Sequence, residues 1–363
     1  MNQQNKHSRL PPSSAARRVA CPGSRKLEEP FQGIQSQYSY EGNLAHAVAA
    51  QMLQGFFIPE DIHVTKEMTD GALLYFEYIT KICGAFNIFI EERVDISNIH
   101  PECWGTPDCW SYNPIDRILH VFDYKFGHGY VDVFENWQLI EYSAGILPMI
   151  KTSEKNIKVH FHIIQPRSYH PEGTCRVWET DHFSLLPYFK TLQSTEHEAM
   201  KDITFCYVSS ECTNCKARHL CQTLQKNTAG LIDVSLNNIP QELDGNQCGH
   251  ELKALQRAAE LIDARITGLY EHAMHLIRTG KQVAGYTAER SNGRIAWKVP
   301  EPEVEALGDM CGVNLLKLAE VITPRQAIKA GVPEQIVMLY TEIKHGALKL
   351  VPVNTRKIFN ENN

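Results

Sequence analysis

The chain has 363 residues and a net charge of −6, and its 43% hydrophobic and 21% charged residues are typical of a globular protein with room for two domains. No apolar run is long enough to span a membrane, and the polar, basic N-terminus lacks the apolar core of a signal peptide, so we expect a cytoplasmic protein. The acidic balance argues against general nucleic-acid binding but leaves room for a local basic track. Eleven cysteines in such a chain indicate metal ligands and buried thiols rather than disulfides.

The first part of the chain is expected to alternate helices and strands after a flexible start. Residues 1–20 are rich in Asn, Gln, Ser and Pro, which favours flexibility. Apolar residues at helical spacing predict helices over 38–55, 68–86, 135–150 and 182–200, the last with Asp181 as its N-cap. Runs with strand character predict strands over 87–96, 158–166 and 174–180.

The stretch Gly105–Lys125 is expected to form a β-hairpin, because an Asn-Pro pair and an Asp-Arg pair supply turn residues between two strand-like runs. The start of one antiparallel strand lies beside the end of its partner, so Asp108 should lie beside Asp123 and Lys125. Two carboxylates can hold a hard cation such as Mg²⁺, and a lysine beside them can orient water. A salt-bridged hairpin at the surface is the alternative.

Three further side chains accompany this hairpin in the sequence. His46, in the motif Gly42-x3-His46, lies on the first predicted helix, where a histidine of the core or surface is the simpler interpretation. Gln138 and Tyr142 are four residues apart on the helix predicted at 135–150, so they share one face.

Four cysteines lie within sixteen residues: Cys206, Cys212, Cys215 and Cys221. The spacing Cys212-x2-Cys215 is one used by metal ligands, and Cys221 follows after five more residues. Thiols this dense indicate a bound metal or cluster. Cys21 stands alone far upstream.

The C-terminal part is expected to begin with a linker over 226–249 and a long amphipathic helix over 250–279. A hairpin is then predicted over 284–298, and its Arg290, Arg294 and Lys298 either contact DNA or form a solvated face. Short helices are expected over 303–307, 314–319, 324–330 and 333–339.

One ordered set of motifs resembles the PD-(D/E)XK nuclease superfamily. The set is His46, Pro107-Asp108, Asp123-x-Lys125, Gln138-x3-Tyr142 and Cys212-x2-Cys215-x5-Cys221, with Cys21 upstream. It is most similar to the RecB-like branch with an iron–sulfur cluster, which includes the AddB nuclease domain and the RecB-like nucleases of CRISPR spacer acquisition. The layout also resembles a phage-encoded relative of the latter. The resemblance runs from Cys21 to Cys221, about 200 residues.

This resemblance implies an α/β fold with a restriction-endonuclease-like core, in which helices flank a central mixed sheet. The iron–sulfur region would close the core, and a mainly helical extension with a β-hairpin would follow. The implied domains are a flexible N-terminus over 1–20, a nuclease domain over 21–225, a linker over 226–249 and an accessory region over 250–363.

The resemblance also implies a role for each matching residue. The ligands of a catalytic Mg²⁺ or Mn²⁺ would be His46, Asp108, Asp123 and the carbonyl of Tyr124. Lys125 would position or activate the water, and Gln138 and Tyr142 would orient Lys125 or contact the DNA backbone. A [4Fe–4S] cluster would be held by Cys21, Cys212, Cys215 and Cys221. Cys206 competes with Cys21 for the fourth position, and a local site that used Cys206 would favour zinc.

The expected function is therefore a metal-dependent DNA exonuclease that acts on ends or single strands, with 5′→3′ polarity, in recombination, repair or phage DNA processing. Its partner would be DNA, and its location would be the cytoplasm, or the host cytoplasm if the protein is phage-encoded. One alternative is a catalytically inactive nuclease fold that serves as a DNA-binding or scaffold protein. A further alternative is a zinc-stabilised protein whose cysteines form a DNA- or protein-binding knuckle.

Overall fold

The computed structural model describes residues 8–31, 37–55, 63–84, 86–153, 156–168, 170–234 and 244–286. The chain divides into compact units of residues 1–288 and 289–363, and the second lies outside the described residues. Arg290, Arg294, Lys298 and the four predicted short helices also lie outside them. Within the described ranges, no helix combines the length and hydropathy needed to cross a membrane.

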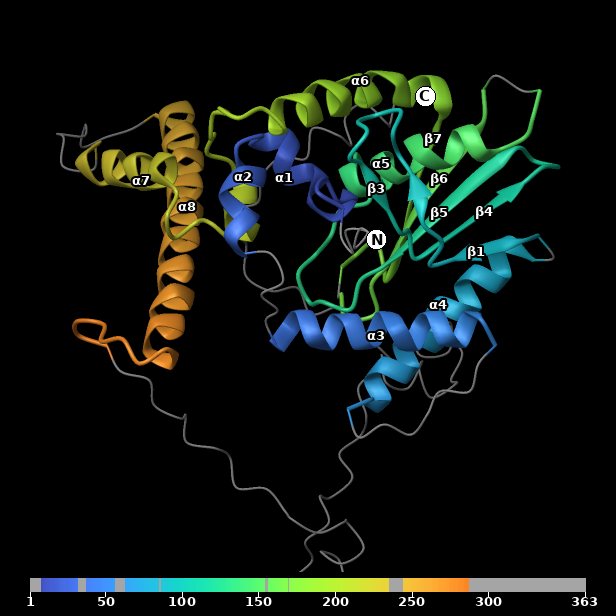
Figure 1. The fold of residues 1–363 in the computed structure, drawn as a ribbon, viewed down its shortest axis with the longest axis horizontal. Coiled ribbons are helices and arrows are strands. Elements are labelled where there is room, and N and C mark those ends of the chain that lie inside the picture. Colours follow the sequence, from blue (N-terminus) through green and yellow to red (C-terminus); the bar gives the residue numbers. More distant parts are fainter. Residues whose placement is uncertain are drawn as a thin grey trace, which may run out of the picture. The chain divides into compact units, whose positions relative to one another are not determined.

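The described part of the chain alternates helices and strands, as the sequence predicts (Figure 1). In chain order the elements are η1 (Pro12–Ser14), α1 (Ala15–Ala20), α2 (Ser24–Glu28), η2 (Glu29–Phe31), α3 (Gln37–Leu53), α4 (Lys66–Cys83), β1 (Ile88–Ile90), β2 (Val94–Asp95), β3 (Trp104–Gly105), β4 (Cys109–Asn113), β5 (Ile118–Tyr124), α5 (Trp137–Ile146), η3 (Leu147–Met149), β6 (Lys158–Ile164), β7 (Cys175–Asp181), α6 (His182–Ala199), η4 (Ser210–Asn214), α7 (Gln222–Val234) and α8 (Gly245–Arg278).

A mixed five-stranded sheet with the order β1-β4-β5-β6-β7 forms the centre of the fold. The β5–β6 pair is parallel, with α5 in the crossover, and the other three pairs are antiparallel. The prediction of an α/β protein with a mixed sheet flanked by helices is therefore confirmed. A separate small ribbon pairs β2 with β3.

The hairpin of β4 and β5 forms as the sequence predicts. The side-chain oxygen of Asn113 accepts hydrogen bonds from the backbone N–H groups of Ile115 and Asp116, at 2.9 and 3.0 Å, and so closes the turn. Across the two strands, Cys109 pairs with Phe122. This register places the residue before β4, Asp108, next to Asp123 near the end of β5.

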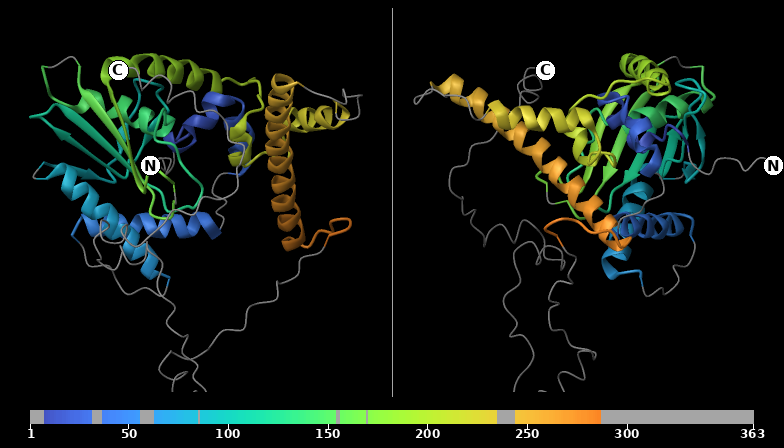
Figure 2. Two further views of the ribbon diagram at one scale, coloured as in Figure 1. Left: turned by 180° about the vertical axis from the view of Figure 1, so that it is seen from behind. Right: turned by 60° about the vertical axis from the view of Figure 1, so that its left-hand side comes forward.

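Helices cover both faces of the sheet (Figures 1 and 2). An apolar core lies between the sheet and the helices on each face. Alternation along β5 sends Leu119 and Val121 to the core with α5 and α6, and Phe122 and Tyr124 to the core with α3 and α4. Asp123 therefore belongs to the α5 face of the sheet.

The N-terminal segment is built into the first core, so the prediction of a flexible 1–20 is wrong for residues 8–20. Arg18 on α1 is only 1% exposed. Its Nε donates to both carboxylate oxygens of Glu196 on α6, at 2.8 and 2.7 Å, and its Nη2 lies 3.1 Å from Oε2 of Glu141 on α5. The polar, Pro-rich composition of this segment predicted flexibility. It could not show that Arg18 would pair with two acids far along the chain.

Burial opposes the charge on both acids of this triad. It raises the pKa of Glu141 to about 8 against the attraction of Arg18, and the nearby Glu196 raises it further. Burial likewise raises the pKa of Glu196 against the attraction and hydrogen bond of Arg18.

The prediction of a linker over 226–249 is wrong for its described residues, 226–234 and 244–249. Residues 226–234 belong to α7, and α8 begins at Gly245 behind the N-cap Asp244. The predicted helix over 250–279 is confirmed, with an earlier start. Arg218 fixes α8 in place, because it pairs with Glu271 at 2.7 Å and its carbonyl accepts a 2.9 Å hydrogen bond from Arg265. The compact unit therefore extends to 288, beyond the predicted boundary at 225.

Replacing Arg18 with Met should lower the free energy of unfolding by about 3–5 kcal/mol, because two carboxyl groups would stay buried without their cation. Equilibrium denaturation with urea measures this change. Arg9 offers a matched control: it meets Glu102 at 3.9 Å with 42% of its side chain exposed, and Arg9→Met should cost less than about 1 kcal/mol. Equal effects of the two substitutions would contradict a structural role for the triad.

Candidate active site

The carboxylate of Asp108 is fixed from two sides where β4 begins. Its Oδ2 accepts a 2.7 Å hydrogen bond from the backbone N–H of Tyr124, and its Oδ1 lies 3.2 Å from Nδ1 of His46 on α3. The predicted approach of His46 from its helix to the hairpin is thus present. Burial opposes ionisation, but the attraction and hydrogen bond of His46 lower the pKa of Asp108 overall. Asp108 in turn raises the pKa of His46 against its own burial.

Lys125 extends the site on the α5 side of the sheet. Its Nζ donates 3.0 Å hydrogen bonds to Oδ1 of Asp123 and to Oε1 of Gln138. The amide Nε2 of Gln138 donates to the same Oδ1 of Asp123, at 3.1 Å. Three side chains predicted from the sequence therefore form one closed triangle. Burial opposes the charged form of Lys125, but Asp123 and Asp108 outweigh it and raise its pKa.

One carboxylate oxygen of Asp123, Oδ2, can still accept a hydrogen bond or a metal ion. Its Oδ2 is buried and lies 2.9 Å from Nζ of Lys125, yet it accepts no hydrogen bond of good geometry. Burial raises the pKa of Asp123 against the attraction of Lys125, and Asp108 raises it further. This oxygen is already beside the ammonium of Lys125 but keeps lone-pair capacity for one further partner, such as a metal ion.

Glu91 joins the site although sequence analysis assigned it no role. The predicted strand over 87–96 is interrupted at this residue, where φ is +50°. Ile90 pairs with Cys109, and the backbone N–H of Glu91 donates to the carbonyl of Asp108 at 3.2 Å. Ligand atoms of Glu91, His46 and Asp108 lie within 4.8 Å of one another. An acid directly after a short apolar strand was the available signal.

The three clustered ligands open into a hollow of about 430 Å³. Its remaining lining comes from one face of α3, where two alanines leave space; these residues are Asn43, Ala47 and Ala50. Partial burial in this hollow and the charge of Asp108 raise the pKa of Glu91 to about 7. The hollow gives a phosphate-sized group access to the acidic cluster from solvent.

Tyr142 is only 6% exposed, and its hydroxyl donates to the carbonyl of Thr106 at 3.0 Å. It therefore supports the chain that leads into Asp108. It also lies in hydrogen-bond contact with Gln138, the partner of Lys125, and its predicted roles stay predictions. A Cβ at Gly105 would come within 2.7 Å of the Tyr142 ring, so this close packing requires glycine. The Tyr124 ring is fully buried, and metal binding by its carbonyl stays a prediction.

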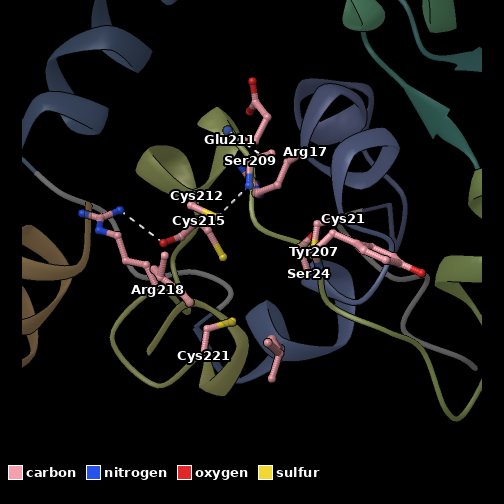
Figure 3. A pocket seen from close by; sticks show the side chains of 12 residues that line it. Arg17, Cys21, Ser24, Tyr207, Ser209, Glu211, Cys212, Cys215, Arg218 and Cys221 are labelled. Atoms are coloured by element: carbon pink, nitrogen blue, oxygen red, sulfur yellow. Dashed lines mark hydrogen bonds between the residues drawn. The ribbon is translucent and has the colours of Figure 1, made fainter. Parts of the chain in front are cut away.

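The four predicted cluster cysteines line a single cavity (Figure 3). They come from the end of α1 and from the segment around η4, and they are Cys21, Cys212, Cys215 and Cys221. Backbone N–H groups point at two of the thiols: Tyr207 donates to Sγ of Cys21 at 3.3 Å, and Ser209 donates to Sγ of Cys212 at 3.5 Å. N–H groups aimed at sulfur favour the thiolate, which is the form that binds metal.

Cys206 lies beside the same cavity. A hydrogen bond from Cys206 lowers the pKa of Cys221 to about 6 and that of Cys21 to about 7, with further help from backbone N–H groups. A Cβ at Gly23 would meet Sγ of Cys206 at 2.7 Å, so α2 also packs closely on this thiol. Both candidates for the fourth position are therefore within reach of Cys221.

The N-terminal helices reach the cysteine segment through other contacts as well. Glu28 accepts hydrogen bonds from Nε of Arg17, at 2.9 Å, and from the backbone N–H of Lys216, at 2.6 Å. Arg17 also donates to the carbonyl of Asn214, at 3.2 Å. Cys21 is thus held against a segment that follows it by almost two hundred residues.

The model of a family described as "Protein of unknown function (DUF2800)" matches residues 7–307, well over half of the chain. The matched range includes the acidic site, the cysteine cavity and α8.

Replacing Glu91 with Gln should weaken Mn²⁺ binding at least about tenfold, because the cluster would lose a charged ligand. Titration followed by the electron paramagnetic resonance of free Mn²⁺ measures the affinity. Glu92→Gln, an exposed neighbour on the same backbone, should bind as the wild type does. Equal affinities for all three proteins would remove Glu91 from the site.

Proposed function

Because the chain belongs to the DUF2800 family, whose description leaves function open, we propose a function from the site itself: the protein is a metal-dependent deoxyribonuclease of the PD-(D/E)XK type. One observation carries this proposal. His46, Glu91 and Asp108 cluster at an open hollow, and the strand register places next to Asp108 a second acid, Asp123, which is paired with a restrained lysine.

The donor set fits a hard divalent cation. Carboxylate oxygens and one imidazole suit Mg²⁺ or Mn²⁺, and the unsatisfied Oδ2 of Asp123 supplies a further oxygen. The ligands would be His46, Glu91, Asp108 and Asp123. When bound, the cation supplies Lewis acidity toward water and charge neutralisation at a phosphoryl oxygen.

Lys125 positions water and stabilises negative charge; it does not act as the base. Its raised pKa keeps the ammonium protonated at neutral pH, so it donates hydrogen bonds. Gln138 and Asp123 hold the Nζ atom in one place, which limits the reorganisation needed when a phosphodiester enters. Gln138 is therefore a positioning residue, and Tyr142 supports it through a side-chain hydrogen bond while its hydroxyl also donates to the Thr106 carbonyl.

DNA is the proposed partner, and the resemblance to RecB-like nucleases supports exonuclease action on ends or single strands with 5′→3′ polarity. The hollow beside α3 gives room for one backbone phosphate. Recombination, repair or phage DNA processing in the cytoplasm is the corresponding setting. These finer features rest on the resemblance, whereas the hydrolytic chemistry rests on the site.

We further propose that the cysteine cavity holds a [4Fe–4S] cluster. Among the described residues, two groups of three side chains bring their ligand atoms within 4.8 Å of one another, and neither group includes a cysteine. No three of the cavity's thiols are therefore as close together as that. A tetrahedral zinc ion with Zn–S bonds of about 2.3 Å would hold its sulfur atoms only about 3.8 Å apart. The wider spacing of these thiols supports a larger group. Such a cluster joins α1 to the η4 segment and so has a structural role.

Asp123→Ala and Lys125→Ala should each lower the rate of DNA cleavage at least about 100-fold, because each removes charge from the reacting phosphate's surroundings. The assay uses cluster-loaded protein with Mn²⁺ on end-labelled linear DNA and on circular DNA. Glu92→Ala serves as the control and should cleave as the wild type does. Equal cleavage by all four proteins would sink the catalytic assignment and favour the inactive scaffold.

Cys21→Ser should bleach the anaerobically purified protein, whereas Cys206→Ser should leave its brown colour and iron content unchanged. Cys21→Ser removes one of the four proposed thiolate ligands of the cluster, whereas Cys206→Ser removes none. Absorbance with iron and sulfide analysis measures this. Bleaching by Cys206→Ser instead would reassign the fourth ligand, and a colourless protein that contains zinc would refute the cluster.

A further inference from the structure

Three histidines converge on the face of the sheet that lies away from Asp123. The parallel register pairs His120 on β5 with His160 on β6, and His162 follows two residues later on the same face. One ring nitrogen from each lies within 4.8 Å of the other two. Two neighbouring strands thus bring three imidazoles to one point beneath α4.

The rings are held in a defined orientation. Nδ1 of His120 lies 3.0 Å from Nε2 of His162, and Nδ1 of His162 lies 3.1 Å from the hydroxyl of Tyr78 on α4. Phe122 stacks on the ring of His162 at a centroid distance of 4.5 Å. Tyr78 therefore hydrogen-bonds with Nδ1 of His162, and Nε2 of the same ring faces His120.

The spacing of these nitrogen atoms matches a single tetrahedral ion. Zinc–nitrogen bonds of about 2.0–2.1 Å hold two ligand nitrogens about 3.3 Å apart. The observed 3.0 Å between His120 and His162 differs from this by a few tenths of an ångström. To bind an ion at these two nitrogens, the ring that donates the shared hydrogen bond takes its other neutral tautomer. Its proton then sits on the opposite ring nitrogen, and both facing nitrogens offer a lone pair.

We propose that His120, His160 and His162 form a binding site for a borderline divalent transition ion of the Zn²⁺, Co²⁺ and Ni²⁺ class. Imidazole nitrogen suits these ions, whereas Mg²⁺ prefers oxygen, so the site is chemically distinct from the acidic hollow. It is also independent of the proposed nuclease function, because its residues lie on the other face of β5 from Asp123.

The ion would tie three strands together. His160 is the most accessible of the three, and its Nδ1 lies 4.0 Å from a carboxylate oxygen of Glu179, its partner on β7. The Glu179 side chain is 72% exposed and can move to occupy the fourth position, which water otherwise fills. Tyr78 supplies the outer hydrogen bond that metal-bound histidines ordinarily make.

The test is a Co²⁺ titration of untagged, full-length, cluster-loaded protein in excess Mg²⁺, which occupies oxygen sites. The readouts are bound cobalt per chain and the difference absorption against the same protein without cobalt, which removes the cluster's own absorption. Thiolate ligation would add an intense near-ultraviolet band to this difference that imidazole ligation lacks. We expect one Co²⁺ per chain without that band. His160→Gln, at the most accessible ligand, should weaken the affinity more than tenfold, and Tyr78→Phe should weaken it about tenfold.

His275→Gln, a substitution of an exposed histidine at the end of α8, is the matched control and should bind as the wild type does. A chelator should also lower the unfolding temperature of the Co²⁺-loaded wild type but not that of His160→Gln. Coincident isotherms for the wild type and His160→Gln, or cobalt found only with the thiolate band, would overturn the proposal. Cleavage of DNA is not a readout, so failure here leaves the nuclease proposal standing.

Discussion

The buried pairing of Arg18 with Glu141 and Glu196 is the interaction on which the arrangement of both candidate sites depends. It locks α1 against α5 and α6 in an apolar core where an unpartnered charge costs several kcal/mol. α5 carries Gln138 into the acidic site, and α1 ends at Cys21 in the cysteine cavity. One ion triad therefore sets the position of an element from each site, although neither site contains a member of it.

Strand β5 organises the chemistry on the two faces of the sheet. Odd positions bring Asp123 to the α5 face, where Lys125 and Gln138 complete a hydrogen-bonded triangle. Even positions bring His120 to the α4 face, where it meets His162. Because side chains alternate strictly along a strand, a shift of register by one residue would exchange these faces and destroy both groupings. The parallel pairing with β6 prevents such a shift, since it fixes seven residue pairs at once.

The parts of this structure that sequence predicts are the local ones. The hairpin that joins Asp108 to Asp123 follows from turn residues within one short stretch, and Asp181 caps α6 as its position before an apolar run indicates. Glu91 escaped prediction because it reaches the site through a break in its strand and through pairing with β4. The structural role of Arg18 was not predicted because its partners lie on helices far away in the sequence. The histidine cluster requires the β5–β6 register, which no local pattern specifies.

The distance along the chain between Arg18 and its partners has a consequence for the order in which the protein takes shape during synthesis. Glu141 follows it by 123 residues and Glu196 by 178. Chains are made from the N-terminus, so α1 leaves the ribosome long before either acid exists, and it must wait undocked while the sheet assembles. α1 can complete its docking only after Glu196 has been made, and Cys21 can meet Cys212, Cys215 and Cys221 only once these later residues exist. The first helix of the chain is thus among the later parts of this fold to settle.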